Sequence, residues 1–173
     1  MTRRTALVFA VLTLMASFTA CHKVSYNGQT GKILHKKYNP ALNISYIDSD
    51  SVTVQTWDTL YIDLDQDKST DLKVYFEYSI PFIQAMKDWQ ICILETGNLN
   101  ITDACWWGQG IHVLYDFVHP IAVVHNAEDG AYYGWLDAYS FLGSDGQQRI
   151  IRFYLRETAF CTCINYPLRW GEE

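Results

Sequence analysis

The sequence has few charged residues and lacks the motifs of several well-known catalytic sites. Only 18% of its residues are Asp, Glu, Lys or Arg, whereas 15% are aromatic and 49% are hydrophobic. This composition excludes an intrinsically disordered chain, because enough apolar surface is present to form a core. There is no Gly-x-Ser-x-Gly elbow, no His-Glu-x-x-His pair and no phosphate-binding loop. We therefore expect a protein that is not an enzyme.

The longest apolar run is also short. The segment ALVFAVLTLMASF (residues 6–18) follows Arg3 and Arg4 and is too short for a comfortable transmembrane helix. It is followed by FTAC, which ends at Cys21 and resembles the site where lipoprotein signal peptides are removed. We predict a lipoprotein signal peptide over residues 1–20 and a lipid on Cys21; an ordinary secretory signal is the alternative. The expected location is the cell envelope, in the outer membrane.

The mature chain is acidic and has the length of one domain. Residues 1–20 contain two of the 13 Lys and Arg residues and none of the 19 Asp and Glu residues, so the remaining 153 residues carry a net charge of −8. Such a charge argues against nucleic acid and against electrostatic docking on membranes. We expect the lipid to provide the membrane contact, polar residues 21–31 to form a flexible tether, and residues 32–173 to form the domain.

Four cysteines remain after Cys21. An even number of cysteines in an exported chain suggests two disulfides. Two of the four are only two residues apart, so direct bonding between them is geometrically awkward. We expect each of these two to pair with one of the other two, with free buried thiols and a metal site as alternatives. The candidates are Cys92, Cys105, Cys161 and Cys163.

Alternation of polar and apolar residues predicts an all-β fold. Residues 60–65 and 71–79 alternate with a period of two, which is typical of half-buried strands. NAEDG (126–130) and GSDG (143–146) predict hairpin loops. The one helical candidate is residues 80–89. These signals predict a single antiparallel β-sandwich, with a closed barrel as the alternative. Further strands are expected at 51–57, 89–95, 111–118, 121–126, 131–139 and 149–155.

The segment DLDQDKSTD (63–71) is the strongest candidate site. Hard oxygen ligands at positions 1, 3, 5 and 9 of a tight loop suit calcium, and the backbone carbonyl of position 7 is a further candidate. Position 6 usually requires Gly because its φ is positive, and Lys68 occupies it here. An acidic turn without an ion is the alternative, because Asp is common in turns. The expected ligands are Asp63, Asp65, Asp67, Ser69 and Asp71.

Three segments in this order resemble a family of uncharacterised exported proteins and lipoproteins of Bacteroidota-type bacteria. The family has a D-x-[DN]-x-D-G-x-x-D segment, a YGW strand and a P-[IL]-x-x-G ending. The counterparts here are DLDQDKSTD (63–71), YYGWLDAY (132–139) and YPLRWG (166–171), with Lys68 in place of the family's Gly. The resemblance implies a β-rich protein of the cell envelope and implies no catalytic residues.

Tryptophans beside glycines give an alternative function. Trp106 and Trp107 precede Gly108, and exposed aromatic rings can stack on sugars. This would make the chain a carbohydrate-binding module; a glycoside hydrolase is a further alternative, although the spacing of carboxylates singles out no pair. Burial of these tryptophans at one end of the sandwich is the simpler interpretation. We expect Trp135 in the core, and at Gly134 either a close backbone approach or a bulge.

Overall fold

The computed structural model of the chain describes residues 16–49, 58–94, 100–103, 107–114, 120–145 and 148–172. Within these residues the chain forms strands and one short 3₁₀ helix, and every strand pair is antiparallel. The elements are β1 (Ala16–Tyr26), β2 (Gln29–Ser49), β3 (Leu60–Ile62), β4 (Leu72–Glu77), β5 (Ile80–Ala85), β6 (Trp89–Ile93), η1 (Ile101–Asp103), β7 (Gly110–His112), β8 (Ile121–Ala127), β9 (Gly130–Asp145) and β10 (Gln148–Cys161).

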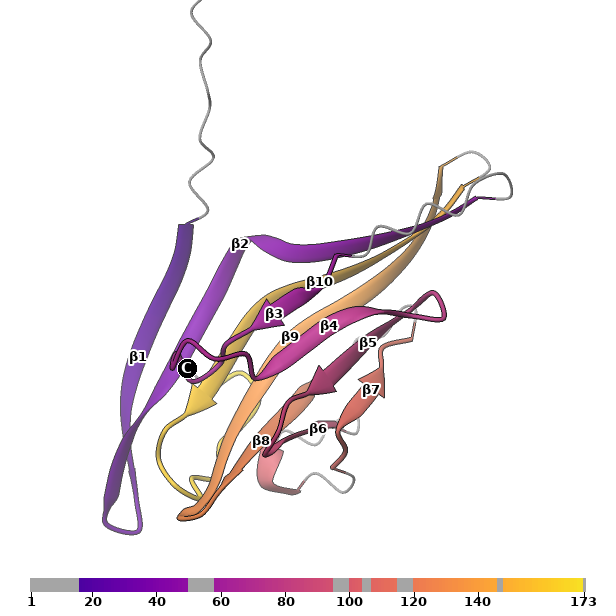
Figure 1. Cartoon of the computed structure of the whole chain (residues 1–173). Coiled ribbons are helices and arrows are strands. Elements are labelled where there is room, and N and C mark those ends of the chain that lie inside the picture. The colour runs from indigo at the N-terminus through magenta and orange to yellow at the C-terminus, as the bar shows by residue number, and fades with distance from the viewer. Residues whose placement is uncertain are drawn as a thin grey trace, which may run out of the picture.

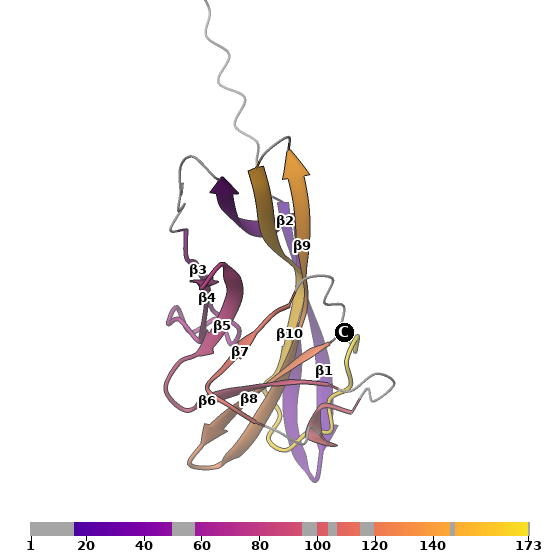
Figure 2. The ribbon, with the colours of Figure 1, turned by 90° about the vertical axis from the view of Figure 1, so that its right-hand side faces the viewer.

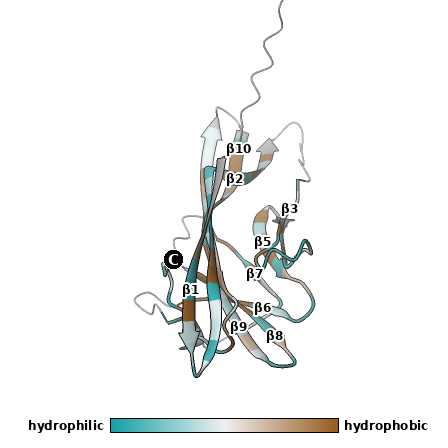
Figure 3. Ribbon diagram, turned by 90° about the vertical axis from the view of Figure 1, so that its left-hand side faces the viewer, coloured by the Kyte–Doolittle hydropathy of each residue, from teal (hydrophilic) through white to brown (hydrophobic). Residues whose placement is uncertain are grey.

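Two sheets pack against each other as a β-sandwich, which confirms the predicted fold class (Figure 1). In the described chain the larger sheet has the strand order β1-β2-β10-β9-β8-β6 and the smaller one has β3-β4-β5-β7. The smaller sheet lies to one side of the larger one, and the two do not close into a barrel (Figure 2). Alternation of hydrophilic and hydrophobic residues runs along several strands (Figure 3), as expected for strands with one buried face.

The central part of the larger sheet is buried on both faces. One face packs on the smaller sheet through a cluster that joins Leu72 and Ile83 to Val123 and Leu155. The opposite face packs on η1 and on the residues after β10, through a second cluster that includes Trp135, Cys161 and Leu168. The indole N–H of Trp135 donates a hydrogen bond to the backbone oxygen of Glu172 (3.3 Å), so the end of the chain closes over this face. Trp135 is therefore core, as predicted.

Residues 80–89 do not form the predicted helix. The two residues before them, Tyr78 and Ser79, both have positive φ (49° and 66°) and make a two-residue turn from β4 into β5. Such turns usually contain Gly or Asn, so this sequence carried no clear turn signal. After the turn, burial alternates along β5, with Ile83 and Ala85 inside and Gln84 exposed. Packing against the larger sheet decides the structure of this segment.

The N-terminal part of the domain also differs from the prediction. Residues expected as a flexible tether (21–31) form the second half of β1, a turn at Asn27 and Gly28, and the start of β2. The long strand β2 was missed because polar residues interrupt its alternation, and one of them, His35, is buried in the sheet. The predicted strand at 51–57 lies outside the described residues, and so does much of the one at 111–118.

Gly134 tests how tightly the larger sheet is packed. A Cβ there would lie 2.6 Å from the backbone oxygen of Ala159 and 2.8 Å from Cγ2 of Val123. Overpacking of this kind typically costs about 1–3 kcal/mol, so Gly134→Ala should lower the free energy of unfolding by that amount. Urea denaturation measures the change. Gly108→Ala is the control, because nothing lies nearer than 3.8 Å to a Cβ there; equal stability of the two variants would contradict the packing of β9.

Candidate metal centre

The acidic segment forms the loop between β3 and β4. Its two ends are tied together, because Ile62 pairs with Leu72 and the N–H of Asp71 donates to the carbonyl of Ile62 (2.9 Å). Within the loop, Leu64 is buried in the core between the sheets, as is Leu72 just after it. Burial of Leu64 and Leu72 therefore fixes the loop to the core and restricts the positions of the polar residues between them.

Aspartate side chains shape this loop by accepting backbone hydrogen bonds. The carboxylate of Asp65 accepts from the N–H of Asp67 (3.0 Å), and that of Asp67 accepts from the N–H of Ser69 (2.6 Å). The carboxylate of Asp63 reaches across the loop to the N–H of Lys68 (3.0 Å). These contacts hold Lys68 at φ 75°, so the position that usually takes Gly does have the positive φ that its place in the pattern predicts.

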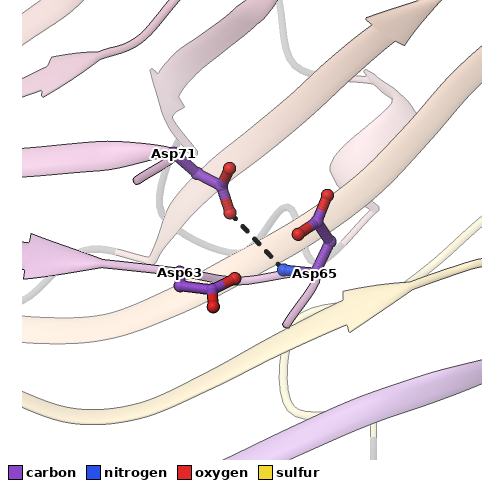
Figure 4. Close-up of side chains that lie close together, drawn as sticks. All are labelled: Asp63, Asp65 and Asp71. Carbon is purple, nitrogen blue, oxygen red and sulfur yellow. Dashed lines mark hydrogen bonds between the residues drawn. The ribbon is translucent and has the colours of Figure 1, made fainter. Parts of the chain in front are cut away.

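Three of the four carboxylates converge. Asp63, Asp65 and Asp71 each offer one oxygen within 4.8 Å of the others (Figure 4). Asp71 is only 3% exposed, and its Oδ2 accepts from the N–H groups of Leu64 (2.6 Å) and Asp65 (3.4 Å). Asp67 lies outside this group, and its carboxylate instead accepts the hydrogen bond from the N–H of Ser69. The sequence thus predicted the cluster, and the structure narrows it from four side chains to three.

One oxygen in this cluster has no partner. Oδ2 of Asp63 is bonded to Lys68, but its Oδ1 is buried and has no hydrogen-bond partner among the described residues. Buried acceptors in folded proteins are almost always paired, so an unpartnered carboxylate oxygen requires an explanation. Among the residues that the structure describes, no Lys, Arg or His forms an ion pair with Asp63, Asp65 or Asp71.

The environment disfavours negative charge on the cluster. Burial raises the pKa of Asp71 to about 7; the charges of Asp65 and Asp63 add to this effect, while the hydrogen bonds from Leu64 and Asp65 oppose it. Burial also raises the pKa of Asp65, and the neighbouring carboxylates contribute. Carboxylates packed this closely repel one another when ionised. A bound cation would relieve both the repulsion and the loss of hydration.

Comparisons with known proteins add no information about this site. No protein-family model, no curated protein and no solved structure matches the chain.

The loop also has neighbours that the sequence did not indicate. Burial raises the pKa of Tyr38, in β2, and the nearby charge of Asp63 adds to this effect. His125, in β8, is near enough to Asp65 to oppose the rise in the pKa of that carboxyl. His125 is itself stacked on Trp89 at 4.8 Å between ring centroids. Tyr38 and His125 are distant from the loop in the sequence and belong to the larger sheet. No local pattern could have placed them beside the loop.

The tryptophan pair does not form an open platform. Trp107 is half-buried and packs against the outer cluster that contains Trp135 and Leu168. Trp106 lies outside the described residues. Trp107 is therefore packed rather than fully exposed, as the simpler interpretation expects, but it lies against the outer face of the larger sheet and not at one end of the sandwich.

The predicted disulfides do not form among the described cysteines. Cys161 and Cys163 are free, these two and Cys92 are each at most 3% exposed, and Cys105 lies outside the described residues. All three pack as small apolar side chains in the outer cluster. Burial raises the pKa of the Cys161 thiol to about 11, which keeps it protonated and unreactive. Cys21, by contrast, is exposed on β1.

The pKa of Asp71 gives a pH dependence of stability without any metal. Its pKa in the folded state, about 7, lies above the unfolded value of about 3.9. Below about pH 4 both states hold the proton; between pH 4 and 7 the unfolded state releases it first, so stability falls as pH rises. In EDTA, the free energy of unfolding of the parent protein should therefore fall by about 2–3 kcal/mol relative to that of Asp71→Asn as the pH rises from 5 to 8.

Urea denaturation at both pH values measures this difference. Asp88→Asn is the matched control, since Asp88 is exposed in the turn before β6 and its one ion pair among the described residues is with Lys87 at 3.6 Å. If the difference in free energy of unfolding between Asp71→Asn and the parent did not change over this pH range, the pKa of Asp71 would be the same in the folded and unfolded states.

Proposed function

We propose that the chain is a lipid-anchored protein of the outer membrane whose β-sandwich binds one calcium ion at Asp63, Asp65 and Asp71. Its role is binding or structural rather than catalytic. The resemblance to exported Bacteroidota-type proteins supports the same location.

The unpartnered oxygen of Asp63 carries the calcium proposal. It lies in a group of three carboxylates with which no described Lys, Arg or His forms an ion pair, and Asp71 is almost fully buried. Calcium takes six to eight oxygen ligands in flexible geometry, from carboxylates, backbone carbonyls and water. The three side chains supply up to six oxygens, some already used by backbone N–H groups; Asp67, the carbonyl of Ser69 and water are candidates for the remaining positions.

The position of the loop indicates what the ion does. Leu64, between Asp63 and Asp65, and Leu72, next to Asp71, both enter the core, so an ion that holds the loop also fixes the pairing of β3 with β4. No substrate-binding cleft is required for this role. The ion is therefore structural, and its binding stabilises the folded state in proportion to its occupancy.

The anchor proposal relies on Cys21. Its thiol is exposed, and cleavage before it would leave Cys21–Tyr26 as a shorter β1 that still pairs with Gln29–Leu34. Within the described part of the chain, no helix is both long and apolar enough to cross a membrane. Lipid on Cys21 is thus the anchor that this proposal provides.

Calcium should raise the melting temperature of the protein. With calcium at 1 mM and a Kd near 10⁻⁴ M, binding to the folded state alone adds about 1.4 kcal/mol, which corresponds to a few degrees. Asp63→Asn should abolish this increase, because it removes a ligand charge but keeps an acceptor for Lys68. Lys68→Gly should strengthen binding by relieving positive φ and removing a nearby charge.

Differential scanning calorimetry in calcium and in EDTA tests these effects, with Asp88→Asn as a control that should still respond. Identical melting curves in calcium and EDTA for the parent protein would reduce the segment to an acidic turn.

Replacing Cys21 should release the protein from the membrane. Cys21→Ser cannot be acylated, so the variant should appear in the soluble fraction or remain as the unprocessed precursor. Fractionation, together with metabolic labelling by a fatty acid, distinguishes the two results. His22→Ala keeps the cysteine and should stay lipidated. A labelled, membrane-bound Cys21→Ser variant would place the lipid elsewhere.

A further inference from the structure

Positive charge is concentrated at the start of the mature chain. Residues 21–47 contain four lysines and no Asp or Glu, so they carry +4, whereas the rest of the mature chain carries −12. The net charge of −8 hides this asymmetry. In the fold, these residues form the hairpin of β1 and β2 at one edge of the larger sheet (Figure 1).

Two of these lysines oppose each other directly. Lys23 on β1 pairs in register with Lys32 on β2, and both are exposed. Like charges in directly opposite positions destabilise a strand pair. No described carboxylate lies within ion-pair distance of either lysine, whereas Lys37, on the other face of β2, pairs with Glu157 at 2.5 Å. The lysine pair thus lacks the neutralising partner that Lys37 has.

The same face of the hairpin borders a groove of about 710 Å³. Beside the two lysines, its lining includes the hydroxyl-bearing residues Ser25, Thr30 and Thr162. The hydroxyl of Thr162 accepts the backbone N–H of Lys32 (2.9 Å) and donates to the backbone carbonyl of Lys32 (3.3 Å), which fixes this wall to β2. Ser25 and Thr30 are therefore the lining residues whose hydroxyls we expect to donate to a ligand. Ammonium groups together with hydroxyls are the donors that bind a phosphate oxygen.

The groove begins next to the predicted lipid. Side chains alternate along a strand, so Cys21, Lys23 and Ser25 share one face of β1. Cys21 pairs with Leu34, which itself lines the groove. A lipid on Cys21 would therefore bring the groove to the surface of the membrane that holds the protein.

We propose that this groove binds the phosphate headgroup of an anionic phospholipid in the anchoring membrane. The inference rests on the proposed lipid anchor for its geometry and on the unpaired lysines for its chemistry. Electrostatic attraction to anionic lipids acts within about a Debye length, so only residues near the anchor experience it. The hairpin then faces the membrane, and the acidic remainder of the domain points away from it.

Vesicle flotation of a lipid-free chain tests the groove separately from the anchor. The protein is the chain from residue 21 onward with Cys21→Ser, which keeps every pairing of β1 from Cys21 to Tyr26. It should float with vesicles of phosphatidylcholine containing 30% phosphatidylglycerol, but not with phosphatidylcholine alone. Each lysine near an anionic surface contributes about fivefold in affinity, so Lys23→Gln with Lys32→Gln should weaken binding about thirtyfold.

The matched control is Lys73→Gln with Lys87→Gln, which removes the same charge from β4 and from the turn before β6. Binding of this control should change less than twofold, and thermal melting should show that both variants are folded. Equal losses in the two double variants, equal binding to neutral vesicles, or no binding by the parent chain would overturn the proposal. Calorimetric binding of inorganic phosphate without vesicle binding would likewise reject a membrane ligand. Failure of lipidation at Cys21 would leave these binding results unchanged, so the two proposals fail separately.

Discussion

The structure depends on burying both faces of the larger sheet. Four consecutive residues of β8, Ile121 to Val124, are at most 4% exposed, which requires cover on each side. The smaller sheet covers one face, and η1 with the residues after β10 covers the other. At roughly 25 cal/mol for each Å² of apolar surface removed from water, this double burial is the main stabilising term. The remaining features are consequences of where these two layers lie.

The acidic loop gains its geometry from this packing. Leu64, between Asp63 and Asp65, and Leu72, next to Asp71, are held in the core, so these three carboxylates cannot spread apart to reduce their repulsion. Asp71 is drawn inward with them, where it accepts two backbone hydrogen bonds but loses hydration. The unpartnered oxygen of Asp63 lies beside it. Hydrophobic anchoring thus creates a concentration of negative charge that the loop alone would not maintain.

The outer cluster explains why Cys161 and Cys163 are free thiols. Cys161 and Cys163 flank Thr162 at the end of β10, and the backbone N–H of Cys163 points to the sulfur of Cys161 at 3.5 Å. Both thiols fill space around Trp135 and Leu168 as apolar groups. The expectation of disulfides relied on the even number of cysteines in an exported chain. Dense packing gives these side chains a different function, which a count of cysteines could not indicate.

The sequence by itself determined the fold class, the core position of Trp135, the close approach at Gly134 and the acidic cluster. Each of these depends on local information: alternation with a period of two, or aspartates a few residues apart. Tertiary structure decided the rest. It made residues 80–89 into β5, a turn and the first residue of β6. It also made strands of the polar N-terminal segment and placed Tyr38 and His125 beside the acidic loop. These outcomes depend on which distant surfaces cover one another, because pairing partners from other parts of the chain override weak local preferences.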